Sequence, residues 1–330
     1  MYQLTKAVLA LMIGFVISIV FGILLLPLLR KLNVKQSLST YLEKKHKEKE
    51  GTPTMGGLIF ILPTIFTMII LILWGKVEFS TNLFITLFVF ISYGLLGFID
   101  DFLIIKRKNN LGLTEFQKLF GQIVIALVFF YLFMKTGADP VIELTTLNIS
   151  INLHWFYSIF ALFMLVASSN AVNITDGLDG LAGGLSMIAL LTFALISGIS
   201  PAIEGTGEIA VFCFVLVGSL LGFLAFNCRP AKVFMGDTGS LALGGVLAAI
   251  ALITRREVTF IIVMGVFIFE TLVCLIQIIS RVYFKKKVFL MTPFHHHLEK
   301  LGWNERDIVV TFWVIGLLLS MSTIVFGVWF

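Results

Sequence analysis

Residues 154–200 read HWFYSIFALFMLVASSNAVNITDGLDGLAGGLSMIALLTFALISGIS, and this stretch decides how the chain folds. Two apolar segments of membrane-spanning length flank the polar, glycine-rich residues 173–184, NITDGLDGLAGG. Acids are costly near a bilayer unless they bind a cation or take part in chemistry, and Asp176 and Asp179 lie in this break. The stretch therefore predicts two membrane helices joined by a functional loop, whose two carboxylates could hold a divalent cation through oxygen.

The composition of the whole chain extends this interpretation: 58% of its 330 residues are hydrophobic and 13% are charged. Such a composition is typical of a chain that lies in a bilayer. We therefore predict an all-α polytopic membrane protein in which residues 1–330 form a single integral membrane domain. The predicted spans are residues 5–29, 55–75, 79–99, 118–135, 154–172, 182–200, 208–227, 239–254, 258–281 and 308–329. Residues 141–153 alternate apolar and polar side chains around Asn148 and predict a small β-hairpin outside the membrane.

The positions of the basic residues predict the orientation of the spans. Most of the 24 lysine and arginine residues follow odd-numbered spans, and cytoplasmic loops of membrane proteins are enriched in these residues. Both termini and the hairpin are therefore predicted to lie outside the cytoplasm. The basic residues on the outer side are Lys6, Lys76, Lys135, Arg255 and Arg256. This enrichment accounts for the net charge of +5, so the expected partner is the lipid bilayer and not nucleic acid.

Polar residues capable of chemistry share one side of this topology, because they all follow odd-numbered spans. They are Asp100 and Asp101 in GFIDDF, Asn173, Asp176 and Asp179 in NITDGLDG, Asp237 in FMGDTGS, and His295, His296 and His297. Residues that only ended helices would be scattered over both faces of the membrane. Their convergence on the predicted cytoplasmic face indicates one shared site.

Each acidic position also has a simpler interpretation. Asp100 and Asp101 could form a solvated helix end, although negative charge at a helix C-terminus opposes the helix dipole. Asp179 could cap the sixth span while Asp176 binds a metal or a substrate. Asp237 lies between two glycines, either in a plain turn or at a helix N-terminus that suits a phosphate or an acid-bound metal.

The histidine triplet and two further segments add basic and polar groups. Consecutive histidines point in different directions, which favours phosphate binding or proton transfer over a zinc site. Lys49 and Thr54 lie in KEGTPTMGG, a polar lead-in to the second span, although attraction to the membrane surface explains most of the basic run 44–49. Glu270 lies deep in the ninth span, where we expect a buried structural pairing.

Seven segments, taken in order, resemble the phospho-N-acetylmuramoyl-pentapeptide transferases, a family of bacterial enzymes that make the first lipid-linked peptidoglycan precursor. These segments are GTPTMGG, GFIDDF, NLGLTEFQKLFGQ, AVNITDGLDGLAGG, FMGDTGSLALGG, ETLVCLIQ and MTPFHHHLEKLGW. The aspartate motifs alone also resemble the wider superfamily of polyprenyl-phosphate N-acetylhexosamine-1-phosphate transferases. The uninterrupted triple histidine and GTPTMGG narrow the resemblance to the muramoyl-pentapeptide family.

The resemblance implies a Mg²⁺-dependent enzyme of the bacterial plasma membrane with its active site on the cytoplasmic face. Phospho-N-acetylmuramoyl-pentapeptide would pass from its UDP carrier to undecaprenyl phosphate, which gives lipid I and UMP. Asp100 would deprotonate the lipid phosphate, and Asp101 and Asp237 would hold the metal. The residues implied in substrate binding and positioning are Lys49, Thr54, Lys118, Asn173, Asp176, His295, His296 and His297, with His295 counted among the catalytic residues. A homodimer is also compatible with the resemblance.

Two other functions remain as alternatives at this point. A secondary transporter would use intramembrane acids for ion coupling, but such proteins tend to contain two related halves, and no repeat is visible here. A sister transferase would use UDP-N-acetylglucosamine as its donor. For the transferase itself, direct attack by the lipid phosphate and a covalent phospho-aspartate intermediate are both open, and direct attack is preferred because the acids are already employed as base and metal ligands.

Overall fold

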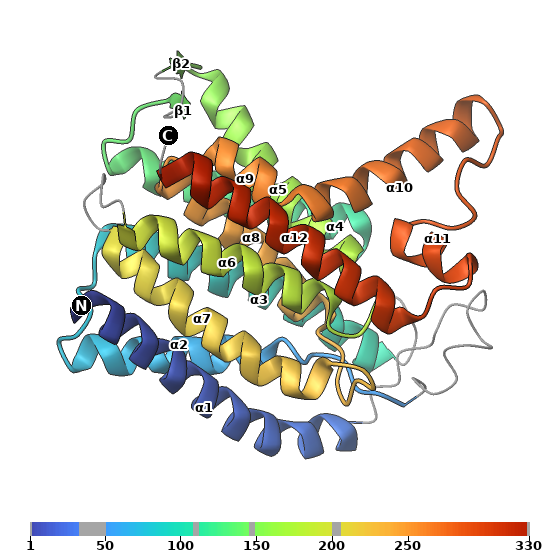
Figure 1. Ribbon diagram of the computed structural model, residues 1–330, viewed down its shortest axis with the longest axis horizontal. Coiled ribbons are helices and arrows are strands. Elements are labelled where there is room, and N and C mark those ends of the chain that lie inside the picture. The colour runs from blue at the N-terminus through green and yellow to red at the C-terminus, as the bar shows by residue number, and fades with distance from the viewer. Residues whose placement is uncertain (1, 33–50, 108–111, 145–148, 200–205, 329–330) are drawn as a thin grey trace.

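A computed structural model of the chain describes residues 2–32, 51–107, 112–144, 149–199 and 206–328, so Lys49 and Asn148 lie outside the described residues. Long helices that run side by side dominate the fold (Figure 1). The elements are α1 (Tyr2–Lys31), α2 (Leu58–Leu73), α3 (Thr81–Arg107), α4 (Glu115–Lys135), β1 (Val141–Leu144), β2 (Ile149–Asn152), α5 (Phe156–Thr175), α6 (Leu181–Ile199), α7 (Thr206–Asn227), α8 (Gly236–Ile253), α9 (Glu257–Val263), α10 (Gly265–Tyr283), α11 (Phe294–Lys300) and α12 (Glu305–Val328).

The helices confirm the predicted all-α polytopic membrane architecture. Among the described residues, 9 helices are long and apolar enough to cross a membrane, and α2 adds a shorter apolar helix of 16 residues. One predicted span, 258–281, is wrong as a continuous helix. It is divided at Met264, whose φ of −82° and ψ of 8° separate α9 from α10. Both parts are apolar, so the sequence pattern contains no sign of the break.

The predicted hairpin is confirmed as an antiparallel pair of β1 and β2, in which Val141 pairs with Asn152 and Leu144 with Ile149. It lies at the end of the bundle where α1 begins and α12 ends, whereas α11 lies at the opposite end (Figure 1). Both ends of the chain therefore approach the same side of the bundle, as an even number of crossings requires. Which side faces the cytoplasm stays a prediction.

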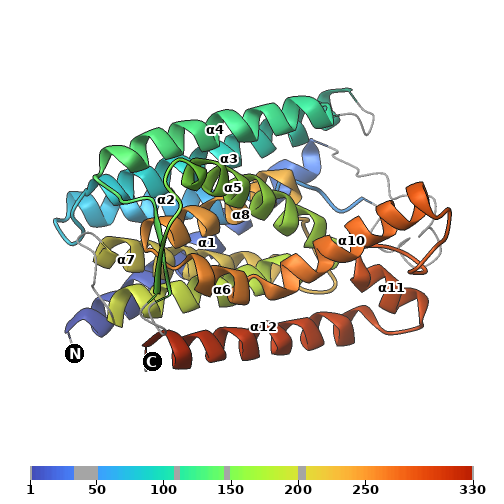
Figure 2. The same cartoon turned by 90° about the horizontal axis from the view of Figure 1, so that it is seen from above.

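The core of the bundle is α8, which lies between α4 on one flank and α12 on the other (Figure 2). Every residue from Thr238 to Ile253 is buried, and α8 packs chiefly against α3 and α5. Small residues allow this close approach, which is the usual way that helices associate in membranes. At Gly244, for example, the Ser168 hydroxyl of α5 donates a hydrogen bond of 2.7 Å to the backbone carbonyl.

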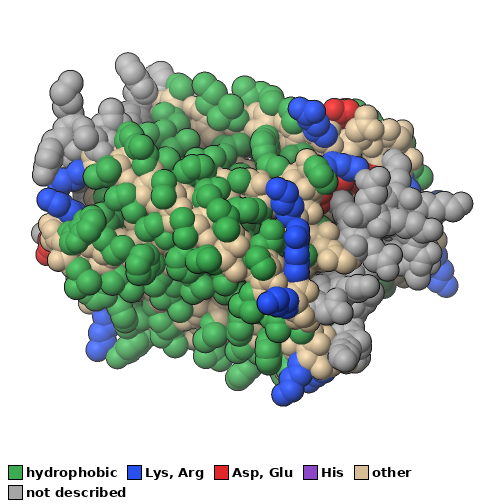
Figure 3. All heavy atoms as spheres, turned by 90° about the horizontal axis from the view of Figure 1, so that it is seen from below, with side chains coloured by type: hydrophobic (Ala, Val, Ile, Leu, Met, Phe, Trp, Pro, Cys, Tyr) green, Lys and Arg blue, Asp and Glu red, His purple; other side chains and the backbone are tan. Residues whose placement is uncertain are grey.

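The outer surface is apolar over most of its length (Figure 3). Lysine and arginine side chains border this apolar surface toward the end that carries α11. They include Arg30 and Lys31 in the last turn of α1, and Lys106 and Arg107 in the last turn of α3. Figure 3 also shows basic side chains at the opposite end, and the positive-inside rule assigns the cytoplasmic side to the end that carries more of them.

Candidate active site

Asp100 and Asp101 lie toward the C-terminal end of α3, where both are buried, each 4% exposed. Asp101 Oδ2 accepts hydrogen bonds from the Thr238 backbone N–H at 3.0 Å and the Thr238 hydroxyl at 2.6 Å. Asp101 Oδ1 accepts a longer bond of 3.3 Å from the Asp237 backbone N–H. The first turn of a helix leaves its N–H groups unsatisfied, so the Asp101 carboxylate completes the N-terminus of α8.

The close approach of α3 and α8 depends on glycine. A Cβ atom at Gly97 would overlap the carbonyl oxygen of Asp237, so a larger residue there would push the two helices apart. Gly236 begins α8 with a φ of +73°, in the left-handed region that favours glycine. A Cβ atom at Gly236 would also meet Asp101 and Thr54, which places the buried Thr54 at the edge of the aspartate cluster.

The segment GTPTMGG forms a short backbone pairing with the segment that precedes α8. Gly56 N–H donates to the Phe234 carbonyl at 2.8 Å, and Gly57 N–H donates to the Met235 carbonyl at 2.9 Å. The Phe234 N–H in turn donates to the Pro53 carbonyl at 2.8 Å. This pairing fixes where α8 begins, and with it the position of Asp237.

Lys118 on α4 contacts acids from two other helices, Asp100 on α3 and Asp237 on α8. A capping box begins α4, in which the Thr114 hydroxyl accepts from the Gln117 N–H and the Gln117 side chain accepts from the Thr114 N–H. This cap places Lys118 in the first turn, facing α3 and α8. Its ammonium group forms a salt bridge with Asp237 Oδ2 and lies 3.7 Å from Asp100 Oδ2.

Asn173 on α5 also contacts the aspartate cluster. Its side-chain amide donates to Asp237 Oδ1 at 2.7 Å and to the Ser240 hydroxyl oxygen at 2.8 Å. Asp100 Oδ1 accepts from the Leu113 N–H at 2.7 Å. Four helices thus present carboxylate, amide and ammonium groups to one small volume, and the Asp237 side chain is 21% exposed there.

The loop after α5 is tied to neighbouring segments beyond the aspartate cluster. Asp176 ends α5, and Asp179, a predicted cap of the sixth span, accepts from the Ala231 N–H at 3.1 Å. Glu305 at the start of α12 accepts from the Asp179 N–H at 2.9 Å and forms a salt bridge with Arg229. The loop is therefore held by contacts to the segment before α8 and to α12.

The three histidines lie on α11 and have different surroundings. His295 is fully buried and packs against Gly177, where any Cβ atom would overlap its ring. His296 contacts the Glu299 carboxylate at 2.7 Å, and His297 Nδ1 accepts from the Leu290 N–H at 3.1 Å. His295 Nδ1 lies 3.3 Å from Glu270 Oε1, and Nε2 has no hydrogen-bond partner among the described residues. His295 alone brings α11 to the NITDG loop, as the predicted convergence requires.

Glu270 shows the buried structural pairing expected from the sequence, and it also connects to the site. Its carboxylate is fully buried and accepts from the Phe294 N–H at 2.6 Å and the His295 N–H at 3.1 Å. The carboxylate thereby holds the start of α11 against α10. This contact with α11 could not be predicted from the sequence, because the two segments are separated by more than twenty positions.

The structure thus brings together Asp100, Asp101, Lys118, Asn173 and Asp237, with Thr54 beside them. His296 contacts Glu299 and His297 accepts from Leu290, both within the segment that forms and precedes α11. Sequence reasoning missed Thr238 and Ser240, which position Asp101 and Asn173. Their place one and three residues after Asp237, at the start of a small-residue helix, was the only available signal.

Helices of membrane-spanning length hold an acidic cluster against the start of α8, and the family match over residues 83–255 identifies the chain as a membrane-embedded transferase. The chain matches the family described as Glycosyl transferase family 4 over residues 83–255. Residues 49–61 match signature 1 of the phospho-N-acetylmuramoyl-pentapeptide-transferases.

Full-length relatives define the family more narrowly. The chain is 46% identical to the phospho-N-acetylmuramoyl-pentapeptide-transferase of Geobacillus sp. (strain WCH70), with 98% of both chains covered. It is also 46% identical to the enzymes of that name from Oceanobacillus iheyensis, with 97% of both chains covered, and from Bacillus subtilis (strain 168), with 96% of this chain and 97% of the relative covered. The chain belongs to the phospho-N-acetylmuramoyl-pentapeptide-transferase family.

Proposed function

We propose that this protein transfers phospho-N-acetylmuramoyl-pentapeptide from its UDP carrier to undecaprenyl phosphate, with release of UMP. An oxygen of the lipid phosphate would attack the phosphorus attached to the sugar. The bond between that phosphorus and the oxygen bridging to UMP would break, and UMP would leave with that oxygen. The observation that carries the proposal is the convergence of Asp100, Lys118, Asn173 and Asp237 in a chain with the relatives named above.

Within this reaction Asp100 is the proposed base for the lipid phosphate. Its Oδ2 lies 3.7 Å from the Lys118 ammonium group, whereas its Oδ1 accepts from the Leu113 N–H. Lys118 is well placed to move from the carboxylates to a substrate phosphate, because a flexible ammonium group binds phosphate as a point charge. Phosphoryl transfer depends mainly on positioning and on electrostatic stabilisation of this kind.

The donor set fits a magnesium ion. Asp100 and Asp237 direct carboxylate oxygens toward one ammonium group, so the space between them already attracts a cation. Magnesium is usually bound by one or two carboxylates together with waters and substrate phosphates. Asp237 is the principal proposed ligand, and Asp101 a second one, because its Oδ1 makes only the longer bond of 3.3 Å. The bound ion would neutralise charge that develops on the leaving phosphate.

The remaining residues are proposed to hold the substrates. Asn173 and Asp176 would bind the nucleotide end of the donor, next to the loop that contacts His295. The Nε2 atom of His295, which has no hydrogen-bond partner among the described residues, would meet a pyrophosphate oxygen or transfer a proton. Thr54 lies beside Asp101 at Gly236 and is proposed to position a substrate. Lys49, His296 and His297 are proposed to bind substrate phosphates.

The proposed location is the bacterial plasma membrane, with the aspartate cluster on the cytoplasmic face. The basic residues that border the apolar surface at this end support that orientation (Figure 3). Proteolytic accessibility of the segment 33–50 in membrane vesicles tests it, because the account requires cleavage only in inside-out vesicles. We also propose a homodimer as a possible assembly, to be measured by the mass of the detergent-solubilised particle.

The activity is tested by following UMP release from the purified protein. Release should require UDP-N-acetylmuramoyl-pentapeptide, undecaprenyl phosphate and Mg²⁺ together. Replacing the donor by UDP-N-acetylglucosamine should abolish release, and activity on that donor alone would identify the sister transferase instead. Ion-driven solute uptake into proteoliposomes without any UMP release would indicate a transporter.

Direct attack by the lipid phosphate is proposed over a covalent enzyme intermediate. Asp101 is engaged by the first turn of α8, and Asp237 by Lys118 and Asn173, which leaves neither as a free nucleophile. Omission of undecaprenyl phosphate separates the two mechanisms. Stoichiometric UMP release with a phosphomuramoyl group trapped on the enzyme would establish the covalent route.

A further inference from the structure

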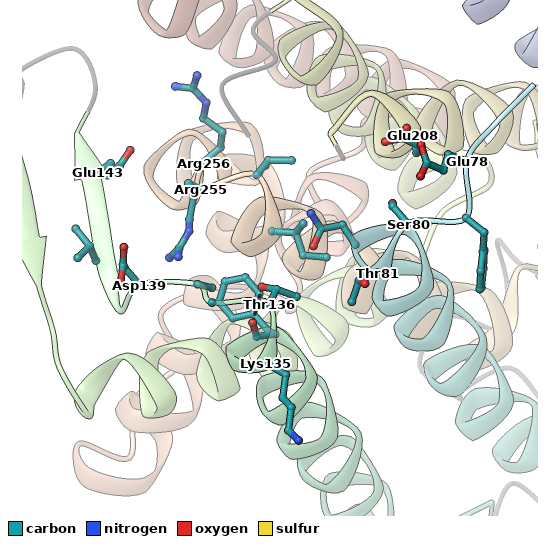
Figure 4. A pocket seen from close by; sticks show the side chains of 18 residues that line it. Glu78, Ser80, Thr81, Lys135, Thr136, Asp139, Glu143, Glu208, Arg255 and Arg256 are labelled. Atoms are coloured by element: carbon teal, nitrogen blue, oxygen red, sulfur yellow. Dashed lines mark hydrogen bonds between the residues drawn. The ribbon is translucent and has the colours of Figure 1, made fainter. Parts of the chain in front are cut away.

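A polar pocket lies at the end of the bundle opposite to the aspartate cluster. Its volume is about 920 Å³, and its walls come from the α2–α3 connection, the end of α4, β1, the start of α7 and the α8–α9 junction (Figure 4). This size suits a small-molecule ligand or a lipid headgroup. Phe79 lines the pocket and is 56% exposed, and Trp74, five positions before it in the chain, is 66% exposed. Exposed aromatic side chains of this kind mark the level of the lipid headgroups.

Arg255 provides a rigid anion-binding group in this pocket. Its backbone has a φ of +56°, a conformation that few non-glycine residues adopt. Its guanidinium lies 5.2 Å from the centre of the Phe133 ring and 5.8 Å from that of Tyr157, and it donates to the Tyr157 hydroxyl at 3.3 Å. No carboxylate of the described residues forms a salt bridge with it, so planar N–H donors remain for a ligand.

Arg256 is adjacent but partly neutralised. Burial lowers the pKa of its guanidinium, while the nearby Glu143 and Glu257 act in the opposite direction. Glu143 and Asp139 line the same side of the pocket as the two arginines (Figure 4). The two arginines on this side are matched in formal charge by Glu143 and Asp139, and Arg255, which has no salt bridge with the described residues, is the group left to bind one phosphate.

Two acids form a separate wall of the same pocket. Glu78 and Glu208 lie near each other, away from the arginines, in Figure 4. Glu208 Oε2 is buried and has no hydrogen-bond partner in the described part of the chain. A buried carboxylate oxygen without a partner is costly, and a cationic donor would satisfy it. The pocket is therefore bipolar, with an anion-binding side and a cation-binding side.

We propose that this pocket binds the zwitterionic headgroup of an aminophospholipid, with its phosphate on Arg255 and its ammonium group between Glu78 and Glu208. A purely anionic headgroup would satisfy Arg255 but would be repelled by the acidic wall. Free phosphate would lack both the ammonium group and the acyl chains that hold a lipid at this level of the membrane. The site is independent of the proposed transferase reaction, because it lies at the other end of the bundle.

The test uses the purified full-length protein with short-chain phosphatidylethanolamine, phosphatidylglycerol, or inorganic phosphate. Native mass spectrometry counts bound lipid, and the thermal unfolding midpoint in detergent measures stabilisation. Phosphatidylethanolamine should bind at least about tenfold more tightly than phosphatidylglycerol, which is the ratio that 1.4 kcal/mol of differential affinity produces. Arg255→Gln should lose most binding, whereas Arg281→Gln, an exposed arginine of α10, should retain it.

Arg255→Gln could lose binding through a folding defect, because Arg255 also contacts Tyr157. A second variant therefore tests the site without changing Arg255. The double variant Glu78→Gln, Glu208→Gln leaves that contact intact and should bind both lipids with similar affinity. Equal binding of the two lipids by the unaltered protein would overturn the zwitterion assignment. Equal stabilisation by inorganic phosphate would overturn the lipid assignment. Full lipid binding by Arg255→Gln, together with an unchanged preference for phosphatidylethanolamine in the double variant, would overturn the site.

Discussion

The two ends of the bundle use charge in different ways. At the aspartate cluster, two acids, Asp100 of α3 and Asp237 of α8, contact the single ammonium group of Lys118, which a metal and a substrate phosphate can replace. At the opposite end, Arg255 is fixed by two aromatic rings, and Tyr157 donates to the buried Glu257 at 2.7 Å. The comparison indicates that the first end is arranged for exchange of cations during chemistry. The second is arranged for retention of one ligand or for stability.

The largest effect is expected from Asp237→Asn, which removes the charge that pairs with Lys118 and the proposed metal. UMP release should fall by about 10²–10³-fold, the range for loss of one preorganised electrostatic group. The Asn173 contact can persist, so the thermal unfolding midpoint should change little. Asp307→Asn, an exposed acid at the start of α12, is the matched control and should keep its rate. A fully active Asp237→Asn protein would refute the assignment of the cluster.

Lys118→Ala should show whether the cluster exchanges cations. Without Lys118, the carboxylates of Asp100 and Asp237 repel each other, so the protein should be less stable in EDTA. Added Mg²⁺ should restore the unfolding midpoint more strongly than in the unaltered protein, while UMP release falls by about tenfold or more because a phosphate-binding group is lost. Lys106→Ala, at an exposed position on α3, provides the control. Loss of Mg²⁺ stabilisation in Lys118→Ala would contradict this view of the lysine.

Gly97→Ala tests the packing of α3 against α8 without changing any charge in the aspartate cluster. The added Cβ atom would overlap the Asp237 carbonyl oxygen, so α3 and α8 must move apart at a cost of about 1–3 kcal/mol. Both the unfolding midpoint and UMP release should fall. Gly198→Ala is the control, because a Cβ atom there would meet only Ala210, at 3.8 Å. Equal stability of the two variants would show that the close approach at Gly97 is not needed.

The smallest effect is expected at the opposite end, from Glu257→Gln. Burial raises the pKa of Glu257, and its hydrogen bond from Tyr157 only partly opposes this. A raised pKa means that the folded state holds the proton more tightly than the unfolded state. The stabilisation is complete below the ordinary glutamate pKa of about 4.3 and is lost as pH rises through the raised value. The unfolding midpoint of the unaltered protein should therefore decline with pH more steeply than that of Glu257→Gln, and parallel pH profiles would contradict the inference.

Sequence reasoning recovered the spans, the hairpin and the convergence of the acids, because hydrophobic length and loop position are visible in the chain. It could not recover the break at Met264, since both sides of the break are equally apolar. It did not foresee that Asp101 would complete the N-terminus of α8, because that contact joins positions more than a hundred residues apart. It placed Arg255 and Arg256 on the outer side without assigning them a role, and only the folded chain shows the pocket that they line.

The most direct test is to locate a bound metal ion in a crystal structure with a UDP analogue, using Mn²⁺ as an anomalous substitute for Mg²⁺. The account predicts one peak on a carboxylate oxygen of Asp237, with Lys118 displaced toward the analogue's phosphates. An anomalous peak only at the Glu78–Glu208 wall, or none within coordination distance of Asp237, would contradict it.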